Sequence, residues 1–393
     1  MNFPAPEFPP RSIRTFVWDL ADDHLDEVLS RLHEYGINGL HVALAYHGGR
    51  FLSVQNPRRT VIQSPDGAVY FQPERDLYHD ILPRPHPEFS SGSFIRQLAD
   101  ALRSWNMCFT SWIVLFNNRM LSTHFPQCCC INAIGDRMEG MLCPSNPDVR
   151  QYAESLMHDL SRNVPNRFIE LEDFSFPDFS RYIGRDWRQV PVGTELNYLL
   201  SLCFCPHCRE TAESMDIEIL DLRRQVERLI RSSLNDDISD RRLGDEIGHP
   251  GHPLSRMAEM RSGIVFDLLT GLKNIAANKD VALGLRMHDH PNEVWRWGVE
   301  LNTISSLELN MTMNACPDPG ATNDQLCRWN DLLHFGQNRA LDLQLSTDSP
   351  EITPDIQKQV EAAESASFQN LILSHYGLTR PYMLELLPVM ARS

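Results

Sequence analysis

Three cysteines within six residues, Cys203, Cys205 and Cys208, have the spacing of a metal site. Thiolates in a C-x-C-x-x-C pattern can surround one tetrahedral ion from a single tight turn, and Pro206 stiffens that turn. The pattern therefore predicts a structural zinc ion. Two alternatives stay open: the cysteines could be buried small apolar side chains, or they could hold an iron–sulfur cluster, which needs a further thiolate nearby and a redox role.

The composition indicates a globular protein of the cytoplasm. The chain has 393 residues, of which 42% are hydrophobic and 22% charged, which is enough to bury a large core. No stretch reaches the apolar length of a membrane span, and the first residues lack the features of a signal peptide. We therefore expect no membrane association, and reduced cysteines rather than disulfides. The formal charge of −16 argues against nucleic acid as a partner and leaves small molecules open.

Strand-like and helix-like segments alternate along nearly the whole chain. Apolar stripes at helical spacing, such as Leu25, Val28, Leu29 and Leu32, separate the strand-like runs. The predicted strands are Ile13–Leu20, Gly39–Tyr46, Cys108–Phe116, Arg167–Asp173, Ala282–His288, Ser305–Asn310, Asp342–Thr347 and Asn370–His375. This series predicts an α/β fold, a (β/α)8 TIM barrel, over residues 1–393 as a single domain.

Two long segments interrupt the alternation, residues 48–93 after the second strand and residues 174–260 after the fourth. Each follows a strand and precedes a helix. In a barrel of this kind both insertions therefore lie on the C-terminal face, where active sites are built.

Alternation within the strands predicts which side chains point into the barrel. Ile169 and Leu171 suit the surrounding helices, so Glu170 and Glu172 face the lumen. The same reasoning directs Glu308 inward from the sixth strand. Further inward or strand-end positions are taken by Trp18, Asp19, His47, Asn117, Arg286, His288, Asp348 and His375. The C-terminal end of the barrel is thus expected to be polar, acidic and aromatic.

Acidic groups on separate strands, with aromatic and polar neighbours, fit the hydrolysis of a glycosidic bond. One acid protonates the leaving oxygen while a second attacks or activates water, and aromatic faces stack on sugar rings. We expect Glu172 to be the proton donor, with its pKa raised by burial, and Glu308 or Asp348 to be the second carboxyl. The other inward residues would bind the carbohydrate substrate. Glu170 has an alternative role as a structural partner of Arg14 or Arg286, and Asp348 as part of a helix-capping turn.

Part of the sequence carries four features in order: the run Leu142–Pro147, then Arg150, then an acid at the end of the fourth strand, and then Cys203–Arg209. This part resembles glycoside hydrolase family 42, the β-galactosidase-type barrels. The resemblance covers roughly residues 36–210. It implies that Glu172 is the acid/base, that zinc is bound by Cys203, Cys205 and Cys208, and that Cys143 is the fourth ligand. In that family asparagine precedes the acid, where this chain has Leu171, and the nucleophile is a glutamate on the seventh strand, where this chain has Asp348.

The fourth zinc ligand has a competing source in the triple Cys128, Cys129 and Cys130. Side chains of successive residues diverge, so adjacent thiols rarely bind one ion together. Cys143, on the loop after the third strand, is the preferred ligand because that strand lies beside the fourth in a barrel.

Two other functions stay open. A metal-dependent sugar isomerase or epimerase would hold a divalent ion with Glu172, Glu308, His288 and Asp348. A catalytically silent barrel would bind carbohydrate without turnover, since the fold does not imply activity. The sequence leaves open the sugar, the linkage, the stereochemical outcome and the oligomeric state, a homo-oligomer included.

Overall fold

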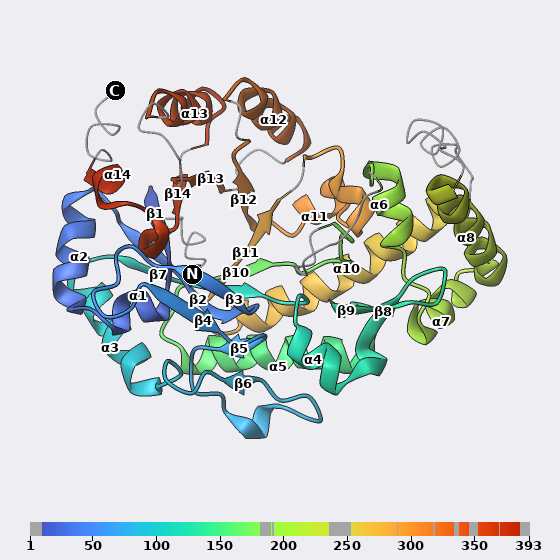
Figure 1. Ribbon diagram of the computed structural model, residues 1–393, viewed down its shortest axis with the longest axis horizontal. Helices are drawn as coiled ribbons and strands as arrows, with labels where there is room; N and C mark the ends of the chain where they lie inside the picture. The colour runs from blue at the N-terminus through green and yellow to red at the C-terminus, as the bar shows by residue number, and fades with distance from the viewer. Residues whose placement is uncertain are drawn as a thin grey trace.

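The computed structural model describes residues 10–180, 190, 192–235, 253–288, 290–316, 319–333, 338–345, 353–368 and 370–385. Its centre is a closed barrel of 8 parallel strands (Figure 1). The barrel strands are β1 (Arg11–Phe16), β2 (Gly39–Tyr46), β7 (Cys108–Val114), β10 (Phe168–Glu172), β11 (Ala282–Met287), β12 (Asn310–Asn314), β13 (Arg339–Gln344) and β14 (Asn370–Ser374). Because β1 pairs with both β14 and β2, the sheet closes on itself. The predicted (β/α)8 fold is confirmed.

Helices surround the barrel and bury one apolar face each against it (Figure 1). They are α2 (Leu25–Glu34), α3 (Gly92–Ser104), α5 (Pro147–Asn163), α10 (Pro253–Ala277), α11 (Leu301–Ser305), α12 (Pro319–Leu332), α13 (Thr353–Ser365) and α14 (Pro381–Glu385). Helix α5 begins at Pro147, because the Asn146 side chain accepts hydrogen bonds from the backbone N–H groups of Asp148 and Val149. None of the helices in the described ranges has the length and apolar character needed to span a membrane.

Three connections beyond the C-terminal ends of barrel strands carry extra elements. After β2 come β3 (Gly49–Leu52), β4 (Val61–Ser64), β5 (Ala68–Val69), η1 (Arg75–Leu77) and β6 (Arg84–Pro85). After β7 come α4 (Arg119–His124), η2 (Pro126–Cys128), β8 (Cys129–Ile131) and β9 (Arg137–Leu142). After β10 come α6 (Thr194–Leu200), α7 (Pro206–Ser214) and α8 (Ile219–Asn235). The elements after β7 are absent from the sequence-based expectations.

The sixth strand lies later in the chain than predicted, which moves Glu308 out of the lumen. Ser305 ends α11, and β12 begins only at Asn310. Between them Glu308 adopts a left-handed backbone conformation, with φ of 51°, and its side chain is exposed. It lies at the N-terminal end of β12, whereas Glu172 lies at the C-terminal end of its strand. The predicted inward position of Glu308 is therefore wrong.

Charged side chains fill the interior of the barrel. Arg14 is fully buried and donates hydrogen bonds to Glu170 Oε2 (2.5 Å) and Asp342 Oδ2 (2.6 Å). Glu170 also accepts hydrogen bonds from His41 Nδ1 (3.0 Å) and Thr312 Oγ1 (2.6 Å). Burial would raise the pKa of Glu170, but the positive charge of Arg14 and the hydrogen bond from His41 hold it well below the ordinary value. Glu170 is thus a structural partner of Arg14, the alternative considered from the sequence.

Replacing Arg14 by methionine leaves Glu170 and Asp342 as buried carboxylates without their shared cation. We expect the free energy of unfolding to fall by about 3–5 kcal/mol, the usual result of breaking a buried ion pair from one side. Denaturant unfolding at neutral pH measures this loss. Arg14→Lys keeps the charge and should lower the free energy of unfolding by less, although a lysine side chain cannot contact both carboxylates with the geometry of a guanidinium group. Equal losses in the two variants would contradict a role for the charge.

Candidate functional site

Glu172 lies at the C-terminal end of β10 and is held from three sides. Its carboxylate accepts hydrogen bonds from Arg286 Nη1 (2.9 Å), Trp112 Nε1 (2.6 Å) and His288 Nε2 (2.7 Å). Arg286 Nη2 also lies 3.1 Å from Asp342 Oδ2, so this group is connected to the charges in the barrel interior. The structure therefore brings together three residues predicted from the sequence, Glu172, Arg286 and His288.

Asn314, on β12, closes a ring of hydrogen bonds around this carboxylate. Arg286 Nε donates to Asn314 Oδ1 (3.3 Å), so the amide nitrogen of Asn314 faces His288 Nδ1 at 2.7 Å. An amide nitrogen only donates, which makes Nδ1 of His288 the acceptor and assigns its ring proton to Nε2. That proton is donated to Glu172. The ring fixes the orientation of all four side chains.

The charge state of Glu172 differs from the expected one. Burial would raise its pKa, but the charge of Arg286 and the hydrogen bond donated by His288 outweigh burial and hold the pKa well below the ordinary value. The prediction of a raised pKa is wrong, because it considered the apolar neighbours and missed the Arg286 charge and the hydrogen bond from His288. In the resting protein Glu172 is an ionised carboxylate, which suits a base or nucleophile better than a proton donor.

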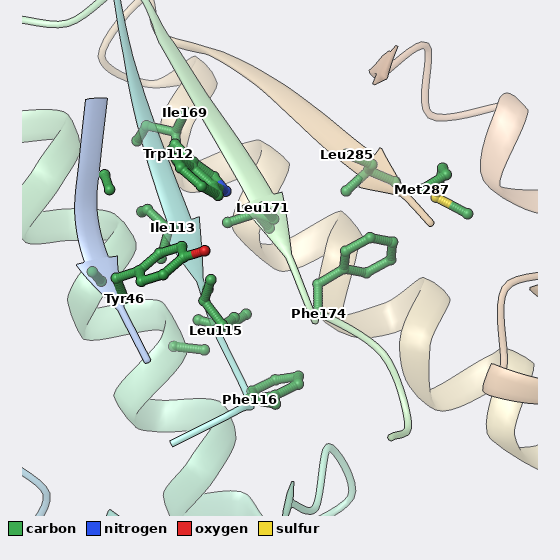
Figure 2. Packing of buried hydrophobic residues seen from close by; sticks show 14 of the residues in the cluster. Tyr46, Trp112, Ile113, Leu115, Phe116, Ile169, Leu171, Phe174, Leu285 and Met287 are labelled. Carbon is green, nitrogen blue, oxygen red and sulfur yellow. The ribbon is translucent and has the colours of Figure 1, made fainter. Parts of the chain in front are cut away.

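Aromatic rings form one wall beside Glu172. Tyr46 and Trp112 come from the neighbouring strands β2 and β7, and Phe174 lies just beyond the end of β10 (Figure 2). The ring of His375, at the end of β14, lies 5.5 Å from that of Trp112. Burial and the nearby Arg286 charge lower the pKa of His375 to about 3, so it is neutral. Tyr46, Trp112 and Phe174 are all buried, so these rings pack around the Glu172 carboxylate and add no charge to it.

Two hollows open near this wall, and Asp173 borders one of them. Asp173, Arg286 and His288 line the first, together with Phe174, Phe176 and Trp297. The second, of about 310 Å³, is lined by the predicted residues His47 and Asn117, among others. Asn117 Nδ2 donates a hydrogen bond to Asp173 Oδ2 (3.2 Å), which joins the two hollows.

Trp18 and Asp19 do not continue β1, because the short helix α1 (Val17–Ala21) begins there. Asp19 Oδ2 accepts a hydrogen bond from the Phe16 backbone N–H (3.1 Å), and burial raises its pKa to about 7. Trp18 is fully buried against Phe51 and Tyr70. Their predicted position at a strand end is wrong. Asp348 lies outside the described residues.

Sequence reasoning missed Trp112, Asp173, Asn314 and Asp342 as members of the site. Trp112 and Asp342 lie within strands whose alternation could have shown them, at Cys108–Val114 and Arg339–Gln344. Asn314 was hidden by the misplaced sixth strand. Asp173 has a φ of 50°, so the simple alternation of an extended strand does not predict its direction.

A second centre is formed by the four buried cysteines Cys143, Cys203, Cys205 and Cys208, whose sulfur atoms all lie within 4.8 Å of one another. Cys143 Sγ is 3.5 Å from Cys208 Sγ and 3.7 Å from the sulfurs of Cys203 and Cys205. Four thiolates bound to one zinc ion at about 2.3 Å would lie about 3.8 Å apart in a tetrahedron. The cysteines therefore fit a single tetrahedral ion. A multi-iron cluster spreads its thiolates over several metals and fits this compact set less well.

Backbone hydrogen bonds hold the two segments that supply these cysteines. The N–H of Cys143 donates to the carbonyl of Cys128 (2.9 Å), and the N–H of Phe204 donates to that of Ile131 (2.7 Å). The N–H of Ile131 points to Cys203 Sγ at 3.5 Å. Cys130 interacts with Cys143 and Cys203 but is not among the four grouped sulfurs. Within the described ranges, geometry thus favours Cys143 as the fourth ligand.

Comparisons with known proteins extend only to the fold. No family model matches the sequence, and no curated protein matches it. The glycoside hydrolase domain of PgaB (BpsB) from Bordetella bronchiseptica is similar in structure, with a TM-score of 0.61 at 12% identity, covering 98% of this chain and 99% of that one. The catalytic domain of β-amylase from Paenibacillus polymyxa has a TM-score of 0.53 at 10% identity, with 97% and 98% covered.

A β-galactosidase from Rahnella sp. R3 has a TM-score of 0.57 at 8% identity, covering 97% of this chain and 55% of that one. The similar structures are thus glycoside hydrolases with barrel folds, a β-galactosidase among them. At these identities the likeness establishes the shared fold, and it does not establish family 42.

The cysteine geometry predicts about one bound metal ion per chain, as in closed structural sites. Cys143→Ser should lose the ion, because it removes one of the four sulfurs, which lies 3.5 to 3.7 Å from the other three. Cys130→Ser is the matched control: it changes a buried thiol of the same region and should keep the metal. Elemental analysis of the purified variants measures the content. Metal retained in Cys143→Ser but lost in Cys130→Ser would reverse the choice of ligand.

Proposed function

We propose that this protein is a glycoside hydrolase-like enzyme that cleaves a glycosidic bond at the C-terminal face of its barrel. The observation that carries the proposal is the ionised Glu172, fixed by Trp112, Arg286 and His288 beside an aromatic wall. Glycoside hydrolysis needs such a carboxylate. The barrel fold shared with glycoside hydrolases supports the same reaction class.

In this proposal Glu172 acts as the base or nucleophile and a second carboxyl supplies the proton. Asp173 is the candidate for that second group, because it borders the hollow that Arg286 and His288 also line. Asp342 is less suited, since Arg14, Arg286 and Ser374 already occupy its carboxylate. Asp348, at the position of the family's nucleophile on the seventh strand, remains the other candidate for the second carboxyl.

A catalytically silent carbohydrate-binding barrel is the second candidate. The observation in its favour is that Arg286 contacts both Glu172 and Asp342, so the two carboxylates have their charges largely compensated. The isomerase or epimerase alternative has less support, because the exposed Glu308 cannot join Glu172 and His288 around one metal ion.

We further propose that the four-cysteine centre holds zinc and that the protein works in a reducing compartment such as the cytoplasm. All ten cysteines lie in the described ranges and are free thiols. A tetrahedral site of four thiolates is a usual site for structural zinc. Cys143, Cys203, Cys205 and Cys208 would bind the ion and add folding stability, with no part in the bond cleavage.

The test of function compares Glu172→Gln with Asp173→Asn on a panel of natural glycosides and aryl glycosides. Loss of the Glu172 carboxylate should lower turnover of both substrate types by at least roughly 10²-fold, because its charge acts on the sugar itself. Asp173→Asn should impair natural substrates strongly and aryl glycosides with good leaving groups weakly, because these need less protonation. Steady-state rates on matched substrates give the comparison.

Thermal melting of each variant controls for folding, because Glu172→Gln weakens the contact with Arg286. Sugar binding measured by calorimetry separates the two candidate functions. The silent barrel would be supported, and the proposed enzyme excluded, by two results together. The wild-type protein would bind sugars without hydrolysing any glycoside of the panel, and the Glu172→Gln variant would bind the same sugars with the same affinity.

A further inference from the structure

Arg261 is a fully buried cation without an anionic carboxylate partner. It lies in α10 and has 0% exposure. Within the part of the chain that the structure describes, none of its three guanidinium nitrogens has a hydrogen-bond partner of regular geometry, and its nearest polar interaction is a weak one with the Tyr198 hydroxyl. The other fully buried arginine, Arg14, is paired with Glu170 and Asp342. A buried charge is costly without a partner, so the position of Arg261 calls for an explanation.

The surroundings of Arg261 are aromatic rings and the cysteine centre. Its guanidinium carbon lies 4.5 Å from the ring centre of Phe176 and 5.8 Å from that of Tyr198. The groups that favour its charge electrostatically are Tyr198, Cys130, Cys208 and Cys203. Helix α10 packs against α7, whose first turn carries Cys208. The thiols of Cys130, Cys203 and Cys208 thus lie close enough to act on the Arg261 charge, next to the Tyr198 phenol.

The charge balance of a loaded cysteine centre matches this cation. Four thiolates around one divalent ion carry a net charge of minus two, and this charge would be buried with the cysteines. Neutral thiols, in contrast, would offset little of the cost of burying Arg261. We propose that Arg261 is the counter-charge of the metal–thiolate centre and a positioning residue that stabilises bound metal.

This role would connect the metal centre to the wall of the candidate active site. Arg261 lies over Phe176, and Phe176 lines the same hollow as Arg286 and His288. The backbone carbonyl of Arg261 also approaches Gly298, where a Cβ atom would come within 2.8 Å, in the segment after Trp297 of that hollow. The inference rests on metal binding and goes beyond the proposed glycoside hydrolysis, so it can fail or succeed independently of that reaction.

The test compares Arg261→Met, which keeps much of the side-chain volume and removes the charge, with Arg261→Lys, which keeps the charge. The full-length protein is measured loaded with Zn²⁺ and after removal of Zn²⁺ by a chelator. Loaded Arg261→Met should melt at a lower temperature than loaded wild type, because the centre loses its counter-charge. Zinc-free Arg261→Met should melt at the same or a higher temperature than zinc-free wild type, because an unpaired buried cation has been removed. A residue that only fills space would not change the melting temperature in opposite directions in the loaded and zinc-free forms.

Release of zinc to a coloured chelator gives a second readout that does not depend on activity. We expect release from Arg261→Met to be about 10- to 100-fold faster, as for other changes next to metal ligands, and release from Arg261→Lys to stay near wild type. Arg296→Met is the matched control: Arg296 is 7% exposed, lies 5.0 Å from the Trp295 ring and pairs with Glu195. Its loss should lower stability equally in both forms and leave zinc release unchanged.

Equal destabilisation of Arg261→Met in the loaded and zinc-free forms overturns the proposal, and so does wild-type protein that binds no zinc. Zinc release from Arg261→Lys as fast as from Arg261→Met also overturns it, since the charge would then be irrelevant. If Arg261→Met does not fold, Arg261→Gln takes its place in the same comparisons. The test measures melting temperature and zinc release and does not measure glycosidase activity. Its result can therefore be interpreted even if the proposed function is wrong.

Discussion

The pairing of buried charges inside the barrel is the constraint on which the rest of the structure depends. Glu170, Arg14, Asp342, Arg286 and Glu172 form an alternating series in which each charge contacts one of opposite sign. In a dry interior each of these groups would be costly alone, so all of them must be present together. Their strands β1, β10, β11 and β13 lie around the whole barrel, and the series therefore requires the closed strand arrangement.

This pairing also determines how the protein responds to acid. The pKa values of Glu170, Glu172 and Asp342 are lowered in the folded state, because the arginine charges outweigh burial. Their contribution to stability is present above the unfolded pKa values and is lost as the pH falls through the folded ones. His375, with a pKa of about 3, acts in the same direction, since the unfolded chain takes up its proton first on acidification. Each of these four groups therefore makes the folded protein less stable as the pH falls.

The sequence predicted the fold well because its signals are local and periodic. All eight predicted strands overlap a barrel strand or adjoin one at a shared residue, and Gly39–Tyr46 is matched in full. The sixth failed because Leu307 and Leu309 alternate as in a strand while the backbone turns at Glu308, which alternation cannot reveal. Three members of the cysteine centre were predictable from spacing, whereas Cys143 was inferred from the family resemblance and from the position of its loop beside the fourth strand. The ring through Asn314 and the position of Arg261 were not predictable, because they join strands and helices far apart in the sequence.

The metal centre and the candidate active site share their supporting strands. Cys143 belongs to the insertion after β7, and Cys203, Cys205 and Cys208 belong to the insertion after β10. These two strands are neighbours, and they carry Trp112 and Glu172, which form the hydrogen bond at the centre of the site. One ion bound by both insertions would act as a cross-link between the two loops next to Trp112 and Glu172. Such a cross-link reduces the conformational entropy that the loops lose when they adopt one arrangement. A structural metal placed there would therefore affect the geometry of the candidate active site from a distance.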